Sequence, residues 1–297
     1  MKSGFVTFVG RPNVGKSTLV NHLVGTKVAI VSNRPQTTRS AVRGVRTTPA
    51  SQIVFLDTPG LHKPRTLLGE RTNQLALGTL AEVDLACLVL DATGAVGSGD
   101  RFVAERLAAV TTPTFVIVNK VDRASKAAVL EHLASAAQLG DFDGYFPVSA
   151  RTGEGTDALV AEFEARLPEG PAYYPDGMVT DQPENVLAAE LVREKLLAMA
   201  RDELPHSITV TVERDEGDDD ERAHPDDVLR LRAVIRVERE SQKGMVIGRG
   251  GSVLKEAGTK ARLELEKLLG TRVHLETKVT VERDWQRRPA SLDRLGF

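Results

Sequence analysis

The sequence predicts an α/β domain with a mostly parallel sheet and helices on both faces, followed by a smaller α+β domain. Two observations carry this prediction. Short apolar runs alternate with helical patterns up to residue 167, as in successive βα units. Beyond residue 184, one long helical pattern is followed by two strands of alternating polarity. The 297 residues are enough for two domains, each with a core of its own.

The strands of the first domain are predicted from four apolar runs that each end at polar or glycine residues. These runs are GFVTFVG (4–10), SQIVFLD (51–57), LACLVLD (85–91) and TFVIVNK (114–120). Helical patterns follow at 15–25, 98–109 and 158–167. The single cysteine, Cys87, lies inside an apolar run, so we expect it in the core, and a disulfide framework or cysteine-based zinc site is excluded.

The predicted domain boundaries are 1–167 and 185–297, with a linker at 168–184. The linker holds four prolines and two glycines, a composition typical of irregular structure. The second domain is predicted as α–β–β–α–α–β with a C-terminal tail. Its elements are a helix at 185–204, strands at 208–214 and 231–241, a glycine loop, a helix at 252–269 and a strand at 272–282.

Charge is unevenly distributed along the chain. The net charge is only −2, but residues 213–227 hold nine acids and two arginines, which predicts a solvated loop. Residues 241–297 hold twelve Lys or Arg against seven Asp or Glu. The C-terminal part is therefore predicted to face a polyanion. Neither a signal-peptide profile nor an apolar run of about 18 residues is present, so we expect a cytoplasmic protein.

The segment GRPNVGKS, residues 10–17, fits the pattern G-x-x-x-x-G-K-[ST] between a predicted strand and a predicted helix. In this setting backbone N–H groups surround a β-phosphate, Lys16 neutralises phosphate charge, and Ser17 ligates Mg²⁺. DTPG, residues 57–60, follows the next strand, where its acid can hold Mg²⁺ through water and the Gly60 N–H can sense a γ-phosphate. The predicted phosphate-binding residues are Gly10, Arg11, Pro12, Asn13, Val14, Gly15, Lys16, Ser17, Thr18, Asp57, Thr58, Pro59, Gly60 and Leu61.

The base is predicted to be guanine. In NKVD, residues 119–122, Asp122 can accept from N1–H and the exocyclic amine of guanine, which adenine does not offer. SA, residues 149–150, ends a further strand and can offer a backbone N–H to the guanine oxygen. The predicted guanine-binding residues are Asn119, Lys120, Asp122, Ser149 and Ala150. Four motifs in this order at strand ends indicate a GTP site.

Two polar segments without a clear period are predicted to be the switches that respond to the γ-phosphate. Switch I comprises Gln36, Thr37, Thr38 and Arg39, and switch II comprises residues 60–69. Either Thr37 or Thr38 is expected to join Ser17 and Asp57 in the Mg²⁺ shell, and the sequence leaves both open.

The chain resembles the translation-factor-like GTPases in its P-loop (10–17), PQTTR (35–39), DTPG, NKVD and SA. With the C-terminal domain, the whole chain resembles the Era family of bacterial GTPases. The resemblance implies a P-loop GTPase domain joined to a type II KH domain. It also implies GTP or GDP and Mg²⁺ as cofactors, binding to the 3′ end of 16S ribosomal RNA, and a role in maturation of the small ribosomal subunit. A cytoplasmic monomer with peripheral association at the inner face of the cell membrane is expected.

KH domains clamp single-stranded backbone with a G-x-x-G loop between two helices. Here that loop is 248–251. The predicted RNA-binding residues are Lys243, Ile247, Gly248, Arg249, Gly250, Gly251 and Lys255. A stripe at helical spacing is expected to face the core; it comprises Leu254, Gly258, Ala261, Leu265 and Leu268. For Trp285 we favour packing over base stacking.

Leu61 stands where many GTPases place a glutamine that orients the attacking water, which predicts slow intrinsic turnover, with kcat below about 1 s⁻¹. The neighbouring His62 is expected to be exposed and mobile. Asn13 occupies the position at which potassium-activated relatives coordinate K⁺, so K⁺ is a candidate activator. Equal rates in K⁺ and Na⁺ would contradict this hypothesis.

Three hypotheses of function stay open at this point. The first is a GTP-driven RNA-binding switch in ribosome assembly. The second is an RNA-binding protein whose nucleotide only stabilises the fold. The third is a membrane-associated signalling GTPase with a secondary KH domain. NKVD and DTPG favour turnover over static binding, and the sequence holds no basic amphipathic helix or lipidation site, which weakens the third hypothesis.

Overall fold

The computed structural model describes residues 1–200, 207–214 and 228–297. These divide into two compact units, one formed by 1–31 and 35–181 and the other by 182–297 together with 32–34. The α/β class of the first and the α+β class of the second confirm the predicted fold.

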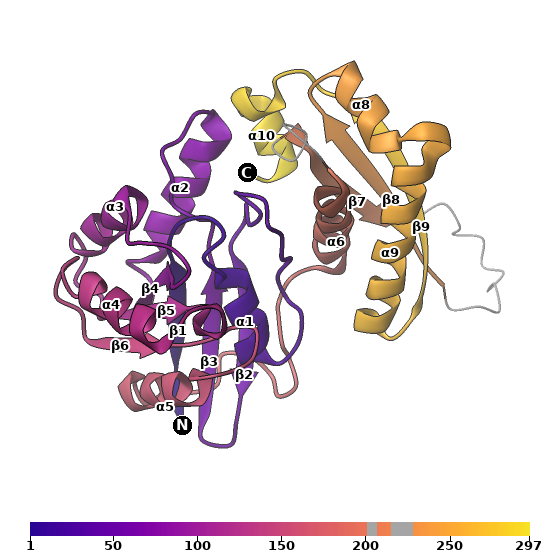
Figure 1. Ribbon diagram of the computed structural model, residues 1–297. Coiled ribbons are helices and arrows are strands. Elements are labelled where there is room, and N and C mark those ends of the chain that lie inside the picture. Colours follow the sequence, from indigo (N-terminus) through magenta and orange to yellow (C-terminus); the bar gives the residue numbers. More distant parts are fainter. Residues whose placement is uncertain (201–206, 215–227) are drawn as a thin grey trace. The chain divides into compact units, whose positions relative to one another are not determined.

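The first unit is built on one six-stranded sheet with the order β2-β3-β1-β4-β5-β6 (Figure 1). Its strands are β1 (Lys2–Val9), β2 (Val42–Thr47), β3 (Ser51–Asp57), β4 (Leu85–Asp91), β5 (Thr114–Asn119) and β6 (Gly144–Pro147). Only β2 is antiparallel to its neighbour, and it forms an edge of the sheet. The sequence analysis missed β2, because VRGVRT mixes arginines and a glycine with its two valines, as an edge strand allows.

Helices cover both faces of this sheet and bury two apolar clusters. The helices are α1 (Lys16–Val24), α2 (Leu67–Thr79), α3 (Ser98–Leu107), α4 (Lys126–Ala136) and α5 (Thr156–Arg166). One cluster joins α1 and α5 to the sheet through residues such as Phe8, Leu19 and Phe163. The other joins α2, α3 and α4 to the opposite face. Cys87 is fully buried in the first cluster, as expected.

The parallel strands place the predicted motifs at the carboxyl end of the sheet. The chain leaves β1 into the loop 10–15, β3 into DTPG, and β5 into NKVD. Because β1, β3, β4 and β5 run in the same direction, these loops lie at their shared carboxyl end, where ligands bind in open α/β sheets.

The segment 168–181 has no helix or strand, as predicted, but it is held along the β2–β3 edge of the first unit. The Val45 N–H donates to the Val179 carbonyl at 2.8 Å. Gln52, on β3, accepts from the backbone N–H of Tyr173 at 2.6 Å and of Tyr174 at 2.9 Å. The linker is therefore ordered by hydrogen bonds to its own unit.

The second unit has a three-stranded sheet with the order β7-β8-β9. Its elements are α6 (Glu184–Met199), β7 (Thr209–Arg214), β8 (Val228–Val237), α8 (Glu240–Ile247), α9 (Ser252–Leu269), β9 (Arg272–Val281) and α10 (Pro289–Leu295). Strand β8 pairs antiparallel with β7 and parallel with β9. Helices α6 and α9 pack against each other and against this sheet (Figure 1). Trp285 is fully buried and donates to the Ser207 carbonyl, so it packs rather than stacks on a base.

Two expectations for this unit change. The strand expected at 231–241 ends at Val237, because Gln242 accepts from the backbone of Glu238 and Arg239 and α8 begins at Glu240. Most of the acidic run 213–227 and the end of the helix expected at 185–204 lie outside the described residues. Within the described ranges, no helix has both the length and the apolar character needed to cross a membrane.

Candidate functional site

The loop between β1 and α1 holds a buried lysine. Lys16 is 6% exposed, and its Nζ donates to the carbonyls of Gly10 at 3.2 Å and Arg11 at 3.0 Å. Burial lowers the pKa of Lys16 to about 8, against the opposing pull of the Asp57 carboxylate. The two carbonyl dipoles stabilise the charged ammonium only in part. A bound phosphate would add the full negative charge that stabilises it further.

Three oxygen ligands lie together beside Lys16. The Asp57 Oδ2 accepts from Ser17 Oγ at 2.6 Å and from Thr38 Oγ1 at 3.0 Å, and the two hydroxyls are 3.1 Å apart. Burial raises the pKa of Asp57, while Ser17, Lys16 and Thr38 act in the opposite direction. Its other oxygen, Oδ1, is buried and has no hydrogen-bond partner in the described part of the chain. Hydroxyl and carboxylate oxygens with unused acceptor capacity fit a Mg²⁺ ion.

The two switch threonines differ in position. Thr38 belongs to the oxygen cluster and is 9% exposed, whereas Thr37 is half-buried. The preceding residue, Gln36, has a backbone φ of 61°, which is uncommon for a residue with a side chain.

His62 connects the two predicted switches. Its Nδ1 lies 3.0 Å from the Gly60 carbonyl and its Nε2 lies 2.8 Å from Gln36 Nε2. Because a carbonyl only accepts, Nδ1 carries the proton and Nε2 accepts from Gln36. Asn73 of α2 donates to the His62 carbonyl at 2.6 Å. The expectation of an exposed histidine is wrong, because His62 is half-buried and held at its ring and backbone.

Leu61 is a core residue. It is 2% exposed and packs in the cluster that contains Ala76 and Leu88. Its N–H donates to the Gly10 carbonyl at 3.2 Å, which ties switch II to the P-loop. An aliphatic side chain in the core offers no group to orient water.

The remaining predicted phosphate-site residues flank these groups. Thr58 is fully buried and its hydroxyl donates to the Phe8 carbonyl at 2.9 Å. Val14 and Pro59 are buried, and Pro12, Gly15 and Thr18 are half-buried. Arg39, predicted as part of switch I, is also buried.

At the predicted guanine end, the side chain of Asn119 links three segments. Its Nδ2 donates to the Val14 carbonyl at 2.8 Å, and its Oδ1 accepts from the N–H of Lys120 at 2.8 Å and of Ala150 at 2.9 Å. Since the Ala150 N–H already has an acceptor, its bond to a guanine oxygen stays a prediction.

The Asp122 carboxylate is exposed and is oriented by Ser149, whose fully buried hydroxyl donates to Asp122 Oδ1 at 2.7 Å. The carboxylate keeps acceptor capacity for two N–H groups of a base. This geometry suits the role predicted for Asp122.

The glycine loop of the second unit forms a sharp turn between α8 and α9. Gly248 has φ 74°, and a Cβ there would lie 2.5 Å from Val253 Cγ2, so only glycine fits. Gly250 and Gly251 also have positive φ, and Arg249 is exposed. Ile247 and Lys243 are half-buried on α8, and Lys255 is exposed on α9.

A cleft of about 360 Å³ adjoins this loop. It is lined by Gly251, Leu254, Lys255, Gly258, Thr259, Arg262, Leu275 and Thr277. Leu254 and Gly258 were expected to face the core, but the buried stripe of α9 consists of Ala257, Ala261 and Leu265. Ala261 and Leu265 of the predicted stripe are buried, whereas Leu254, Gly258 and Leu268 are half-buried. Leu275 and Thr277 of β9 were missed, since nothing in a strand pattern tells which face borders a cleft.

Residues 5–120 match the family described as 50S ribosome-binding GTPase, and residues 203–286 match the KH domain. GTPase Era of Mycobacterium sp. (strain JLS) is 52% identical and covers 100% of this chain and 99% of that protein. GTPase Era of Mycobacterium avium (strain 104) is 50% identical over the same shares.

The chain belongs to the Era family of GTPases.

Two crystal structures of Era match the whole chain, each with a TM-score of 0.94, 40% identity, and coverage of 100% of this chain and 99% of the other. One is an Aquifex aeolicus Era variant bound to GDP·AlF4⁻. The other is Era in complex with MgGDPNP and nucleotides 1506–1542 of 16S ribosomal RNA.

In this Era-family GTPase, the sequence analysis missed Asp91, at the end of β4. Its Oδ2 accepts from Lys120 Nζ at 2.6 Å, and the same ammonium donates to the Asn13 carbonyl at 2.7 Å. A carboxylate that ends an apolar strand beside the NKVD strand was the available signal.

Proposed function

We propose that this Era-family GTPase binds the 3′ end of 16S ribosomal RNA through its second unit, and that the bound nucleotide controls this binding during maturation of the small ribosomal subunit. The observation that carries the proposal is the turn at 248–251. Its positive-φ glycines and exposed Arg249 stand beside a cleft that carries Lys255 and Arg262. The 16S RNA complex of the related Era supports this choice of ligand.

The nucleotide site is proposed to work by positioning. Lys16 and the backbone of 10–17 hold the β- and γ-phosphates, and Asp122 accepts from guanine. Ser17 and Thr38 ligate Mg²⁺, with Asp57 acting on it through water. The ion, when bound, neutralises charge that develops between the β- and γ-phosphates. His62 bridges the Gly60 carbonyl of switch II and the Gln36 side chain of switch I, so we infer that these bonds change between nucleotide states.

Slow intrinsic turnover is proposed on the same grounds. The core packing of Leu61 leaves the attacking water without an orienting side chain at this position. Activation by K⁺ at Asn13, a monomeric state, a cytoplasmic location and peripheral membrane association stay predictions.

The RNA proposal is tested by charge reversal in the full chain. Arg249→Glu and Lys255→Glu should each weaken binding of a fluorescent oligonucleotide with the 3′-terminal 16S sequence by about tenfold, and should reduce the slope of log K against log[salt] by about one phosphate contact. Lys126→Glu, an exposed lysine on α4 of the first unit, is the matched control and should leave binding within about twofold. If all three variants bind like the wild type, the glycine loop is not the RNA site.

A further inference from the structure

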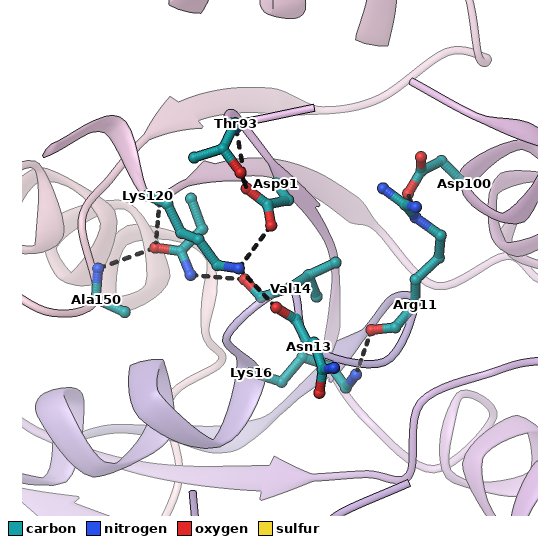
Figure 2. Close-up of polar contacts among 10 residues, drawn as sticks. Arg11, Asn13, Val14, Lys16, Asp91, Thr93, Asp100, Lys120 and Ala150 are labelled. Carbon is teal, nitrogen blue, oxygen red and sulfur yellow. Dashed lines mark hydrogen bonds and ion pairs between the residues drawn. The ribbon is translucent and has the colours of Figure 1, made fainter. Parts of the chain in front are cut away.

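An acidic side chain of α3 reaches into the P-loop. Asp100, in the first turn of α3, accepts from Arg11 Nε at 2.7 Å, and its side chain is only 2% exposed (Figure 2). Its other oxygen accepts from the Gly97 N–H at 2.9 Å. Both carboxylate oxygens are therefore used, one to start α3 and one to hold the second residue of the P-loop.

The stem of Arg11 is fixed by packing as well as by charge. A Cβ at Gly99 would lie 2.6 Å from Arg11 Cδ, so the arginine chain lies directly on the α3 backbone, and only glycine allows this approach. The carbonyl of Arg11 in turn accepts from Lys16 Nζ at 3.0 Å. Asp100 is thus connected through one residue to the lysine that is proposed to bind phosphate.

A second acid holds the same loop two residues further on. Asp91 accepts from Lys120 Nζ, which donates to the Asn13 carbonyl (Figure 2). Asp91 is itself oriented by Thr93, whose hydroxyl and N–H both donate to Oδ1. Burial works to raise the pKa of Asp91, but Lys120 and Thr93 outweigh it and the pKa is lowered.

We propose that Asp100 and Asp91 are positioning residues for nucleotide binding, which hold the P-loop in its phosphate-binding shape through Arg11 and through Lys120. This inference rests on the proposed nucleotide site at 10–17. Within the P-loop, the Arg11 side chain bonds to Asp100, and the Asn13 carbonyl accepts from Lys120, which pairs with Asp91. Both acids belong to the segment 91–100. Removing either acid frees one end of the loop, so the backbone must be ordered again each time a nucleotide binds.

The test measures release of fluorescent mant-GDP from the full chain in the presence of Mg²⁺. Asp100→Asn keeps an oxygen for the Gly97 N–H but loses the charge that holds Arg11. It should raise the dissociation rate roughly tenfold, the size expected for a broken, part-buried charge pair next to a ligand site. Arg11→Gln should raise the dissociation rate by a similar factor. Arg11→Lys keeps a cation near Asp100, so its dissociation rate should stay close to that of the wild type.

The double variant decides whether Asp100 acts through Arg11. Asp100→Asn combined with Arg11→Gln should release GDP no faster than the faster single variant, because the two changes remove one interaction. Multiplicative effects in the double variant, or a wild-type release rate in Asp100→Asn, would overturn the proposal. Asp91→Asn should likewise raise the rate in the wild type and have no further effect in Lys120→Met.

Matched controls separate this proposal from the others. Glu105→Gln, an exposed acid on the same helix, should leave release unchanged. Should Asp100→Asn fail to fold, as judged by its thermal transition, the comparison of Arg11→Gln with Arg11→Lys still decides, since equal rates would contradict the ion pair. Failure of the wild-type chain to bind mant-GDP would instead contradict the nucleotide site itself.

Discussion

At the scale of single residues, the site depends on a buried cation next to a buried carboxylate. Lys16 is buried among carbonyls, which lowers its pKa to about 8. Burial raises the pKa of Asp57, one oxygen of which has no hydrogen-bond partner within the described ranges. Both groups are thus desolvated before any ligand arrives. A phosphate for the lysine and a cation for the carboxylate would stabilise both charges at once.

The lowered pKa of Lys16 predicts how GDP affinity depends on pH. A bound phosphate favours the protonated lysine, so its pKa is higher in the complex than in the free protein. Affinity should be constant below about pH 7.5 and fall as pH rises through about 8, where the free lysine loses its proton. We expect mant-GDP titrations from pH 6.5 to 9.5 to show this fall. Lys16→Met should bind more weakly and lose the component near pH 8; an unchanged pH profile in that variant would contradict the assignment.

The oxygen cluster predicts which switch threonine serves hydrolysis. Thr38 bonds to Asp57 and Ser17 and is proposed to bind Mg²⁺, so Thr38→Ala should lower kcat by about 100-fold, the loss typical of one catalytic contact. Thr37→Ala should keep at least ten times the activity of Thr38→Ala. Single-turnover GTP hydrolysis over a Mg²⁺ titration measures both, and the reverse order of activities would refute the choice.

At the scale of elements, the proline-rich segment 168–181 is held against the sheet of the first unit by Gln52. Gln52 of β3 is fully buried, and its amide exchanges hydrogen bonds with the backbone of Tyr173 and Tyr174. Its Nε2 also donates to Thr47 Oγ1 at 3.0 Å. A single side chain therefore satisfies the backbone of a proline-rich segment that has no regular structure.

Gln52→Ala is predicted to destabilise the first unit by about 2 kcal/mol, because it removes the hydrogen-bond partner of part-buried backbone groups of Tyr173 and Tyr174. Urea unfolding should show the loss, and limited proteolysis should open new cleavage sites between residues 170 and 181. The exposed Gln138→Ala serves as control and should change stability by less than about 0.5 kcal/mol. Unchanged proteolysis of Gln52→Ala would mean that other contacts hold the segment.

Elements with a strong pattern were predictable, and those whose form depends on neighbours were not. The central strands β1, β3, β4 and β5 follow from their apolar runs, and α9 from its period. The helix α4 was missed, because its buried residues are His132 and Ala136, and a sequence pattern does not identify a histidine as core. The segment 60–69 was taken for an irregular switch, although α2 begins at Leu67 after a Thr66 N-cap.

The site shows the same division. Lys16, Asp57, Asn119 and Asp122 could be placed from motifs, since their spacing relative to strand ends fixes where they lie. Other contacts of the site could not be placed in this way, because their partners lie far apart in the chain, as Arg11 and Asp100 do. Nothing local marks such pairs, so only the folded chain reveals them.

At the scale of the whole molecule, one chain carries two loops suited to phosphate. The first, at 10–17, belongs to the GTPase unit, and the second, at 248–251, belongs to the KH unit. Their surroundings differ, because one loop starts a helix beside a cluster of hydroxyl and carboxylate oxygens and the other borders an open cleft with basic side chains. A nucleotide-controlled RNA-binding protein fills both loops and couples them. A protein with a merely structural nucleotide would also fill both, but its RNA affinity would not depend on the nucleotide.

The most direct test of this account is the affinity of the full chain for the 3′-terminal 16S oligonucleotide, measured by fluorescence anisotropy with GDP and with GDPNP at one salt concentration. We predict that the two dissociation constants differ by about 5- to 150-fold, the usual range of coupling between sites. Tight binding with equal affinity in both states would contradict nucleotide control and leave the KH unit as an independent tether.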